Sequence, residues 1–268
     1  PADIVILSAA DTTLALLAAA YPGEGFPSVR LANLLHLRQP ASVDLYLDEV
    51  LQHARVVVID HLGGESYWPY GTEQVGQVCR AHGIALVMFS GDATEDTNLL
   101  MKGSVDVELA RTLWRYLREG GPANARNFYR FIGAQFFGLD DVPEPPRPLP
   151  AVAVFHPAHD FGELAHWQAD WEDGAPCVPV LFYRAHLQAG NTAAFAALCA
   201  ALGEACRLIV DEGANERAAV AALRDGLESA PRGIFPALKV TCATSPRHPG
   251  ALHVRFPGID AADLLTRL

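Results

Sequence analysis

Closely spaced cysteines are missing from this sequence. Its 5 cysteines are scattered along 268 residues, and no two of them form a C-x-x-C pair. An odd and scattered set disfavours both a disulfide framework and a structural zinc site. We therefore expect reduced and mostly buried thiols. They are Cys79, Cys177, Cys199, Cys206 and Cys242.

Long apolar runs and an excess of positive charge are also missing. No uninterrupted apolar run approaches the roughly 18 residues of a membrane span, and the start does not resemble a signal peptide. The formal net charge is −11, whereas phosphate contacts need a basic surface. We expect a soluble, cytoplasmic protein with no nucleic-acid or membrane partner. Because the chain starts at Pro1 and not at a methionine, we also expect a segment of something longer.

Glycine is absent from the first turn at which a nucleotide could bind. Residues 3–7 predict a buried strand and residues 11–20 a helix, and Ser8-Ala9-Ala10 joins them. Without glycine, the backbone of this turn cannot approach a pyrophosphate closely, which disfavours a Rossmann dinucleotide cofactor. The sequence also has no nucleophile elbow, no P-loop lysine motif and no convincing acid–base dyad. It therefore assigns no catalytic residue.

The first 141 residues do contain a repeated β-α pattern. Short apolar runs predict strands, and apolar residues at helical spacing predict the helices between them. Four repeats with short connections predict an α/β fold with a parallel, doubly wound sheet of the Rossmann-like or flavodoxin-like type. The predicted strands are residues 3–7, 29–35, 55–60 and 84–89, and the predicted helices are residues 11–20, 42–54 and 73–82.

Two further helices, residues 105–117 and 122–137, are predicted to form a hairpin against this sheet. Gly120-Gly121 ends the first helix and Gly138 ends the second. Their aromatic residues are numerous and spaced as a buried stripe, so we expect them in the core and not in a ligand stack. They are Trp114, Tyr116, Phe128, Tyr129, Phe131, Phe136 and Phe137.

Residues 142–150 predict a linker, because 5 prolines in 9 residues favour an extended chain and forbid a helix or a central strand. We therefore divide the chain into an α/β domain with a helical hairpin at 1–141 and a second, parallel-sheet α/β domain at 151–268, which can be incomplete. In the second domain we expect strands at residues 151–155, 178–183, 207–210 and 238–242, and helices at 193–202 and 215–227.

The polar cluster after residues 178–183 is the first candidate for ligand contact. Arg184, His186, Asn191 and Thr192 are predicted to follow the carboxyl end of a strand, where open α/β sheets bind ligands. A guanidinium, an imidazole and a helix N-terminus capped by Asn191 and Thr192 suit a ligand that carries carboxylates. The alternative is a salt bridge beside an ordinary helix cap.

A glycine and aromatic loop is the second candidate. Gly63 and Gly64 allow a flat ligand to approach the backbone, and Tyr67, Trp68 and Tyr70 offer stacking faces. The alternative is a tight turn whose aromatic rings cover the end of the sheet.

A third cluster holds imidazoles and one carboxylate. His156 and His159 are weak metal candidates, with Asp160 and His166 nearby, because H-x-x-H fits no strong metal template outside a helix. The alternative is a solvated loop with incidental histidines.

Several successive segments resemble the large subunits of the CobN/magnesium chelatase family, in particular those of aerobic cobaltochelatase. The resemblance runs from Ala2 to Leu202 and corresponds to the N-terminal part of those subunits. From Gly203 onward the β-α periodicity continues without the family's pattern. The matching segments are SAADTTLALLAAA, RLANLLHLRQPASVDLYLDEVLQHARVVV, LGGESYWPYG, LWRYLREGGPANARNFYRF and VPVLFYRAHLQAGNTAAFAALCAAL.

The resemblance implies a ligase that forms nitrogen–metal bonds in cobalamin biosynthesis. Such a subunit binds hydrogenobyrinic acid a,c-diamide and cobalt(II), and inserts the metal while partner motor subunits hydrolyse ATP. The family's catalytic centre is expected beyond this segment, so the chain alone is expected to be inactive and to dock the tetrapyrrole or partner subunits. A hypothesis of another class is a non-catalytic protein-interaction module of α/β fold.

Overall fold

The structure, a computed structural model, describes residues 1–61, 63–149, 154–156, 159–162, 180–211, 239–240 and 254–255. The chain divides into two units. The first comprises Pro1–Ala153 together with Phe182–Asn191, and the second comprises Val154–Leu181 together with Thr192–Leu268. Each unit is described by itself below.

The first unit is built on a parallel four-stranded sheet, which confirms the predicted α/β architecture there. The strand order is β2-β1-β3-β4, and every neighbouring pair is parallel. Each strand begins and ends within two residues of its predicted position. The strands are β1 (Ile4–Ser8), β2 (Val29–Asn33), β3 (Val56–His61) and β4 (Ala85–Ser90).

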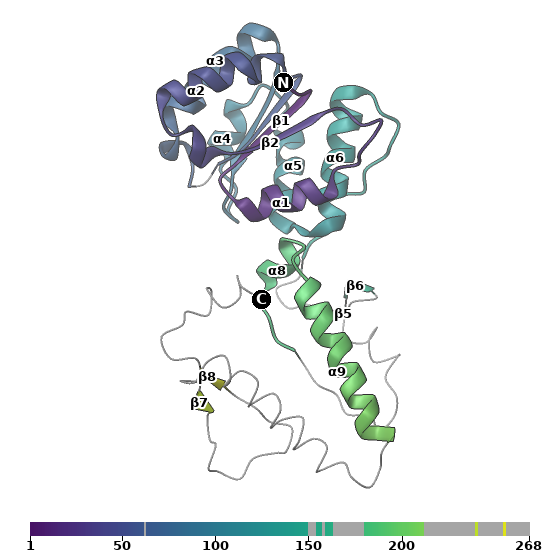
Figure 1. The fold of residues 1–268 in the computed structure, drawn as a ribbon. Helices are drawn as coiled ribbons and strands as arrows, with labels where there is room; N and C mark the ends of the chain where they lie inside the picture. The colour runs from purple at the N-terminus through teal and green to yellow at the C-terminus, as the bar shows by residue number, and fades with distance from the viewer. Residues whose placement is uncertain are drawn as a thin grey trace. The chain divides into compact units, whose positions relative to one another are not determined.

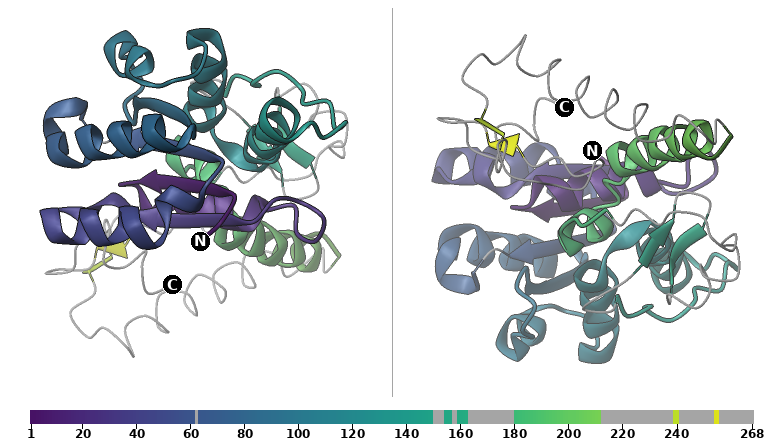
Figure 2. Two further views of the ribbon diagram at one scale, coloured as in Figure 1. Left: turned by 90° about the horizontal axis from the view of Figure 1, so that it is seen from above. Right: turned by 90° about the horizontal axis from the view of Figure 1, so that it is seen from below.

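Helices cover both faces of this sheet, as Figures 1 and 2 show. Alternate residues of β1, β3 and β4 point to opposite faces, so each strand contributes to two separate hydrophobic cores. One core includes Ile4, Val56 and Phe89 and lies against α1, α5 and α6. The other includes Val5 and Val57 and lies against α2 and α3. The helices are α1 (Asp11–Ala20), α2 (Pro40–Glu49), α3 (Pro69–His82), α4 (Thr97–Lys102), α5 (Val107–Glu119) and α6 (Gly121–Phe137).

Local side-chain caps explain two differences between the predicted elements and the structure. β2 ends before residue 35 because the Asn33 side chain accepts a hydrogen bond from the Leu35 backbone N–H at 2.8 Å. That contact starts the 3-10 turn Leu34–Leu37. The short helix α4 was missed, and the Asp96 carboxylate caps it by accepting from the Asn98 and Leu99 N–H groups.

Two predicted helices also have different bounds. The helix predicted at residues 42–54 is α2 followed by the separate 3-10 turn Leu51–His53. α3 begins four residues earlier than predicted, because Pro69 is pre-organised for the first helical turn. It ends at Gly83, which adopts φ 66° as predicted for a glycine stop.

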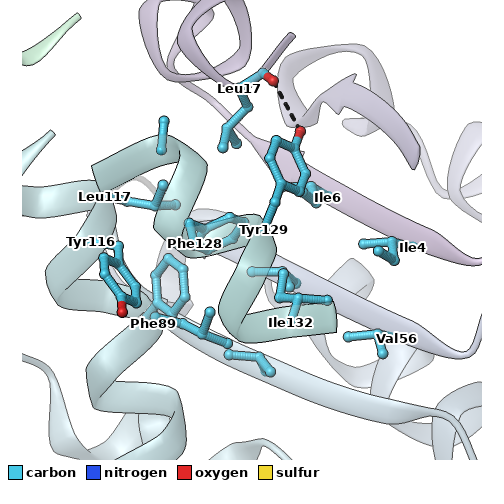
Figure 3. Close-up of a cluster of buried hydrophobic side chains, with 14 of the residues drawn as sticks. Ile4, Ile6, Leu17, Val56, Phe89, Tyr116, Leu117, Phe128, Tyr129 and Ile132 are labelled. Atoms are coloured by element: carbon cyan, nitrogen blue, oxygen red, sulfur yellow. Dashed lines mark hydrogen bonds between the residues drawn. The ribbon is translucent and has the colours of Figure 1, made fainter. Parts of the chain in front are cut away.

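The predicted helical hairpin is confirmed: α5 and α6 pack together against the sheet face that also holds α1 (Figure 3). Tyr116, Phe128 and Tyr129 are fully buried, and the remaining four aromatic residues named above pack against the same core. The Tyr129 hydroxyl donates to the Leu17 carbonyl at 3.0 Å, which satisfies its polar group inside the core. These rings are therefore structural.

The proline-rich segment lacks helix and strand over residues 142–149, in keeping with its composition. It is nevertheless bound to the helical hairpin. The Asn124 side chain donates to the Arg147 carbonyl at 2.8 Å and accepts from the Arg147 N–H at 2.9 Å. Asn127 accepts from the Glu144 N–H, and Leu149 is buried. The segment lies along the first unit, and the domain boundary at 142–150 stays a prediction.

In the second unit, the structure describes one long helix and two pairs of short strands. The helix α9 (Ala193–Asp211) contains the predicted helix at 193–202, but it also covers residues 207–210, so the strand predicted there is wrong. The apolar residues of that stretch continue the helical run past Gly203. The predicted helix at 215–227 lies outside the described residues.

The described strands of this unit pair in antiparallel fashion. β5 (Val154–His156) pairs with β6 (His159–Gly162), and β7 (Lys239–Val240) pairs with β8 (Val254–Arg255). β5 overlaps the strand predicted at 151–155, and β7 lies within the one predicted at 238–242. A second parallel sheet stays a prediction.

Candidate functional site

The segment that we expected to be a strand followed by a polar loop has a different structure. Residues 180–183 form no strand, and Leu181 and Tyr183 are 94% and 79% exposed. The predicted buried strand is therefore wrong over these residues. Arg184–Gln188 form a short helix, α8, which buries Leu187 and is followed two residues later by Gly190 with φ 66°. Local helical hydrogen bonds have replaced the expected sheet pairing.

Arg184 fixes α8 to the first unit. Its Nη2 donates to the Leu149 carbonyl at 2.6 Å and lies 3.7 Å from Oε2 of Glu119, at the end of α5. Glu119 also accepts a hydrogen bond from the Leu149 N–H at 2.8 Å. The guanidinium thus joins α8 to both α5 and the proline-rich segment. This is the salt bridge that the sequence left open as an alternative.

Gly120, between α5 and α6, lets α8 approach closely. A Cβ atom at this position would lie 2.6 Å from the Gln188 carbonyl oxygen. Its φ of 68° and ψ of −165° are also a conformation that is nearly restricted to glycine. The Gln188 side chain donates to the Arg118 carbonyl at 2.9 Å from the same side. Absence of a side chain at Gly120 is thus a condition for this docking.

A buried polar cluster lies at the carboxyl edge of the sheet. Asp60, at the end of β3, accepts from the Ser8 hydroxyl at 2.8 Å and from Arg118 Nη2 at 2.8 Å. Asp60 is 2% exposed. Burial raises the pKa of its carboxyl, and the charge of Arg118 and the Ser8 hydrogen bond act in the opposite direction. Arg118 also donates to the Gly91 carbonyl after β4.

Arg118 therefore connects the sheet edge with α8. Its side chain binds Asp60, and its carbonyl accepts from Gln188. Sequence reasoning missed Ser8, Asp60 and Arg118 as a group. The available signal was a carboxylate directly after the apolar run of β3, but the partner in α5 lies 58 residues away and no local pattern links the two.

Gly190 and Asn191 line a cavity of about 720 Å³ in the first unit. The other walls come from α1, from the chain that follows it and from α6. Arg126 and Arg130 stand at this cavity, and neither was a candidate in the sequence. Asn191 therefore lies at a concave surface, although Arg184 and His186 do not line it. Thr192 belongs to the second unit, where its carbonyl accepts from the Ala196 N–H at the start of α9.

The glycine and aromatic loop does not form a single stacking surface. Trp68 is 5% exposed, and its Nε1 donates to the Leu37 carbonyl at 2.7 Å. The ring lies against Gly71, where a Cβ atom would come within 1.9 Å of it. Tyr67 is 40% exposed, and the partly exposed Tyr70 donates to Asp44 at 2.7 Å.

Gly63 and Gly64 instead face a shallow hollow of about 470 Å³ that none of these rings lines. Its other walls are polar and include Asp92 and Asp96. The two glycines thus line a hollow that the three aromatic residues do not line, so the five residues do not form one binding surface.

The two histidines proposed as weak metal candidates, His156 and His159, are register partners in the antiparallel pair of β5 and β6. Among the residues that the structure describes, no group of three or more His, Cys, Asp or Glu side chains is arranged to hold a metal ion. Both cysteines whose side chains are described, Cys79 and Cys199, are free thiols, and burial raises the pKa of Cys79 to about 12. In the described part of the chain, no helix has the length and apolarity needed to cross a membrane.

The first unit is thus a doubly wound α/β domain with a helical hairpin, onto which a distant segment of the chain folds back. Residues 114–229 match the family model for CobN/magnesium chelatase. The chain is 45% identical over 233 residues to the aerobic cobaltochelatase subunit CobN of Pseudomonas aeruginosa, covering 85% of this chain and 19% of the relative. It is 34% identical over 211 residues to the subunit of the same name from Sinorhizobium sp, covering 75% and 16%.

A solved structure is similar as well. The catalytic subunit of cobaltochelatase from Mycobacterium tuberculosis matches with a TM-score of 0.55 and 28% identity, over 75% of this chain and 15% of that one. The chain belongs to the CobN/magnesium chelatase family. It spans about a fifth of the length of the curated relatives that it matches.

Proposed function

We propose that this chain is part of the large subunit of an ATP-dependent cobaltochelatase, which inserts Co²⁺ into hydrogenobyrinic acid a,c-diamide in cobalamin biosynthesis. Cobalt is a substrate in this reaction, and separate motor subunits hydrolyse the ATP. The similarity to cobaltochelatase subunits over 85% of the chain carries the proposal.

Within such a subunit, this part has a docking role. Concave surfaces next to the family-matched segment give it places to hold a ligand. Arg184, His186, Asn191, Thr192, Gly63, Gly64, Tyr67 and Trp68 remain the proposed contact residues from the sequence.

The test is reconstitution of the full-length subunit that contains this chain with its motor subunits, Co²⁺, ATP and hydrogenobyrinic acid a,c-diamide. We expect cobalt insertion, followed by the change in corrin absorbance, and no insertion when ATP or the subunit is left out. Insertion of Mg²⁺ into a porphyrin, without insertion of cobalt, would assign the subunit to magnesium chelatase. No insertion of either metal would contradict the proposal.

A second candidate function is a non-catalytic interaction module that docks the motor subunits or the rest of its own subunit. The 79% exposed side chain of Tyr183 favours it, because aromatic residues are enriched in protein interfaces. Pull-down with the motor subunits tests this candidate. Tyr183→Ser should weaken capture, while His186→Ala and the control Met101→Ser should leave it unchanged. Equal capture by every variant would contradict a contact at Tyr183.

A further inference from the structure

The cavity beside Gly190 has the dimensions of a small-molecule site. Its volume of about 720 Å³ lies within the range of roughly 300–1,000 Å³ that ligand pockets occupy. Much of its wall is apolar and comes from α1 and from the chain after it. These residues include Leu16, Ala19, Tyr21 and Phe26, and Leu139, after α6, adds to the apolar wall. Such a wall offers a ring system an apolar surface.

The side chains that line this cavity carry a net positive charge, since two arginines and one aspartate are among them. Arg126 and Arg130 are one turn apart on α6, so both side chains lie on the same face of the helix. Arg130 pairs with Asp141 through its Nε at 3.0 Å. Arg126 forms no ion pair with any residue in the described part of the chain, and it is exposed. One guanidinium therefore remains available to an anion at the cavity wall.

The end of the α8 segment closes one side of the cavity in a way that depends on glycine. Gly190 has φ 66°, and a Cβ atom there would lie 3.1 Å from Leu16 Cδ1 and 3.3 Å from Pro122 Cγ. The chain can therefore pass close to both α1 and α6 at this point. Asn191 follows at once and brings an amide, which can both donate and accept, to the wall.

An apolar wall, a guanidinium and an amide together fit an apolar ring compound that carries carboxylates. Guanidinium binds carboxylate through two parallel hydrogen bonds, which fixes the orientation of a flat ligand as well as its position. We propose that this cavity binds the carboxylated edge of a tetrapyrrole through Arg126, with the rings against the apolar wall. That the ligand is apolar and anionic follows from the side chains of the cavity, and the choice of a tetrapyrrole rests on the proposed function.

Two pairs of variants test the site on the 268-residue chain, with hydrogenobyrinic acid a,c-diamide as the probe and calorimetric titration as the measurement. Arg126→Gln removes the guanidinium and should weaken binding about tenfold, as expected for loss of a charge-assisted pair at a partly exposed site. Arg115→Gln is the control, because Arg115 is an exposed arginine on α5 that does not line the cavity.

The second pair tests the cavity by filling it. Ala18 and Ala19 are both exposed on α1, but only Ala19 lines the cavity. Ala19→Trp should abolish binding at micromolar ligand, whereas Ala18→Trp should leave it unchanged. Urea unfolding of all four variants checks that each one folds.

The outcomes separate this site from the proposed function. Equal binding by the chain and all four variants would overturn the cavity as the site. Absence of binding by the unaltered chain at high micromolar ligand would overturn it as well. If the reconstituted complex still inserts cobalt in either case, the proposed function stands and only this inference fails.

Discussion

Arg118 Nη2 donates to Asp60 Oδ1 at 2.8 Å, although the two residues are 58 positions apart and belong to α5 and β3. The pair is largely closed to solvent, with the Arg118 side chain 17% exposed and that of Asp60 2% exposed. Because Gln188 donates to the Arg118 carbonyl, the same residue also supports the docking of α8. The pair therefore links the sheet edge to α8, which lies within residues 114–229 that match the family model.

Removal of Arg118 should destabilise the fold, because the Asp60 carboxylate stays buried. We expect Arg118→Met to lower the free energy of unfolding by about 3–5 kcal/mol at neutral pH, since it leaves Asp60 buried without its partner. Urea denaturation measures this change. Arg115→Met, on the exposed side of α5, should change stability by less than about 0.5 kcal/mol. Similar losses in the two variants would contradict this role of the pair.

The same variant should change how stability depends on pH. Burial raises the pKa of Asp60 and Arg118 opposes that shift, so removal of Arg118 raises the pKa further. An ordinary aspartate loses its proton at about pH 4. Above that pH, the folded state of the variant still holds this proton and therefore binds more protons than the unfolded state. Stability that is present below this pH is lost as the pH rises through the folded-state pKa.

We therefore expect the unfolding free energy of Arg118→Met to fall more steeply than that of the unaltered chain between about pH 4 and pH 7. Urea titrations at several pH values measure the two slopes. Adding Asp60→Asn to the variant should remove the pH dependence that comes from this carboxyl, so the double variant should parallel the single variant Asp60→Asn. Parallel pH curves for Arg118→Met and the unaltered chain would show that Asp60 does not cause the effect.

Gly120→Ala should release α8. The substitution places a Cβ atom 2.6 Å from the Gln188 carbonyl, in a backbone conformation that costs other residues about 1–3 kcal/mol. We expect faster tryptic cleavage after Arg184 together with a loss of stability of about 2 kcal/mol or more. Gly83→Ala is the matched control: it also has positive φ, but its Cβ would meet open space. It should cost about 1 kcal/mol and leave cleavage at Arg184 unchanged.

Trp68→Phe distinguishes a structural ring from a ligand-stacking one. We expect a loss of stability of about 1–3 kcal/mol, because the Leu37 carbonyl loses its donor and the ring leaves unfilled volume beside Gly71. Titration with hydrogenobyrinic acid a,c-diamide provides the second measurement. An unchanged affinity in a destabilised variant identifies Trp68 as structural, and a lower affinity without a loss of stability would identify ligand contact.

The first unit could be predicted well because its signals are local. Apolar runs such as residues 55–60 fill a strand, and glycines such as Gly83 and Gly138 end helices by adopting positive φ. The family resemblance was likewise carried by short segments. The errors arose where a local pattern fits two structures: residues 180–183 were apolar enough for a strand, and residues 207–210 for either a strand or a helix.

The candidate site was predicted less completely, because it consists of contacts between distant parts of the chain. The sequence identified Arg184 and Asn191 as notable polar residues, but it could not show that Arg184 is held by Glu119 and Leu149 while Asn191 lines a cavity with Arg126. Nor could it show that Trp68 is buried. Such pairings depend on how helices pack over the sheet, and neither composition nor spacing encodes that packing directly.

By itself, the sequence determined the α/β class of the first unit, its parallel strands, its helical hairpin and its family. Only the tertiary structure decided that residues 182–191 belong with the first unit, that Asp60 and Arg118 form a buried pair, and that α1, α6 and Asn191 enclose one cavity. The reason is physical. Hydrophobic periodicity fixes which face of an element is buried, whereas the identity of the neighbour on that face is set by the packing of the whole unit.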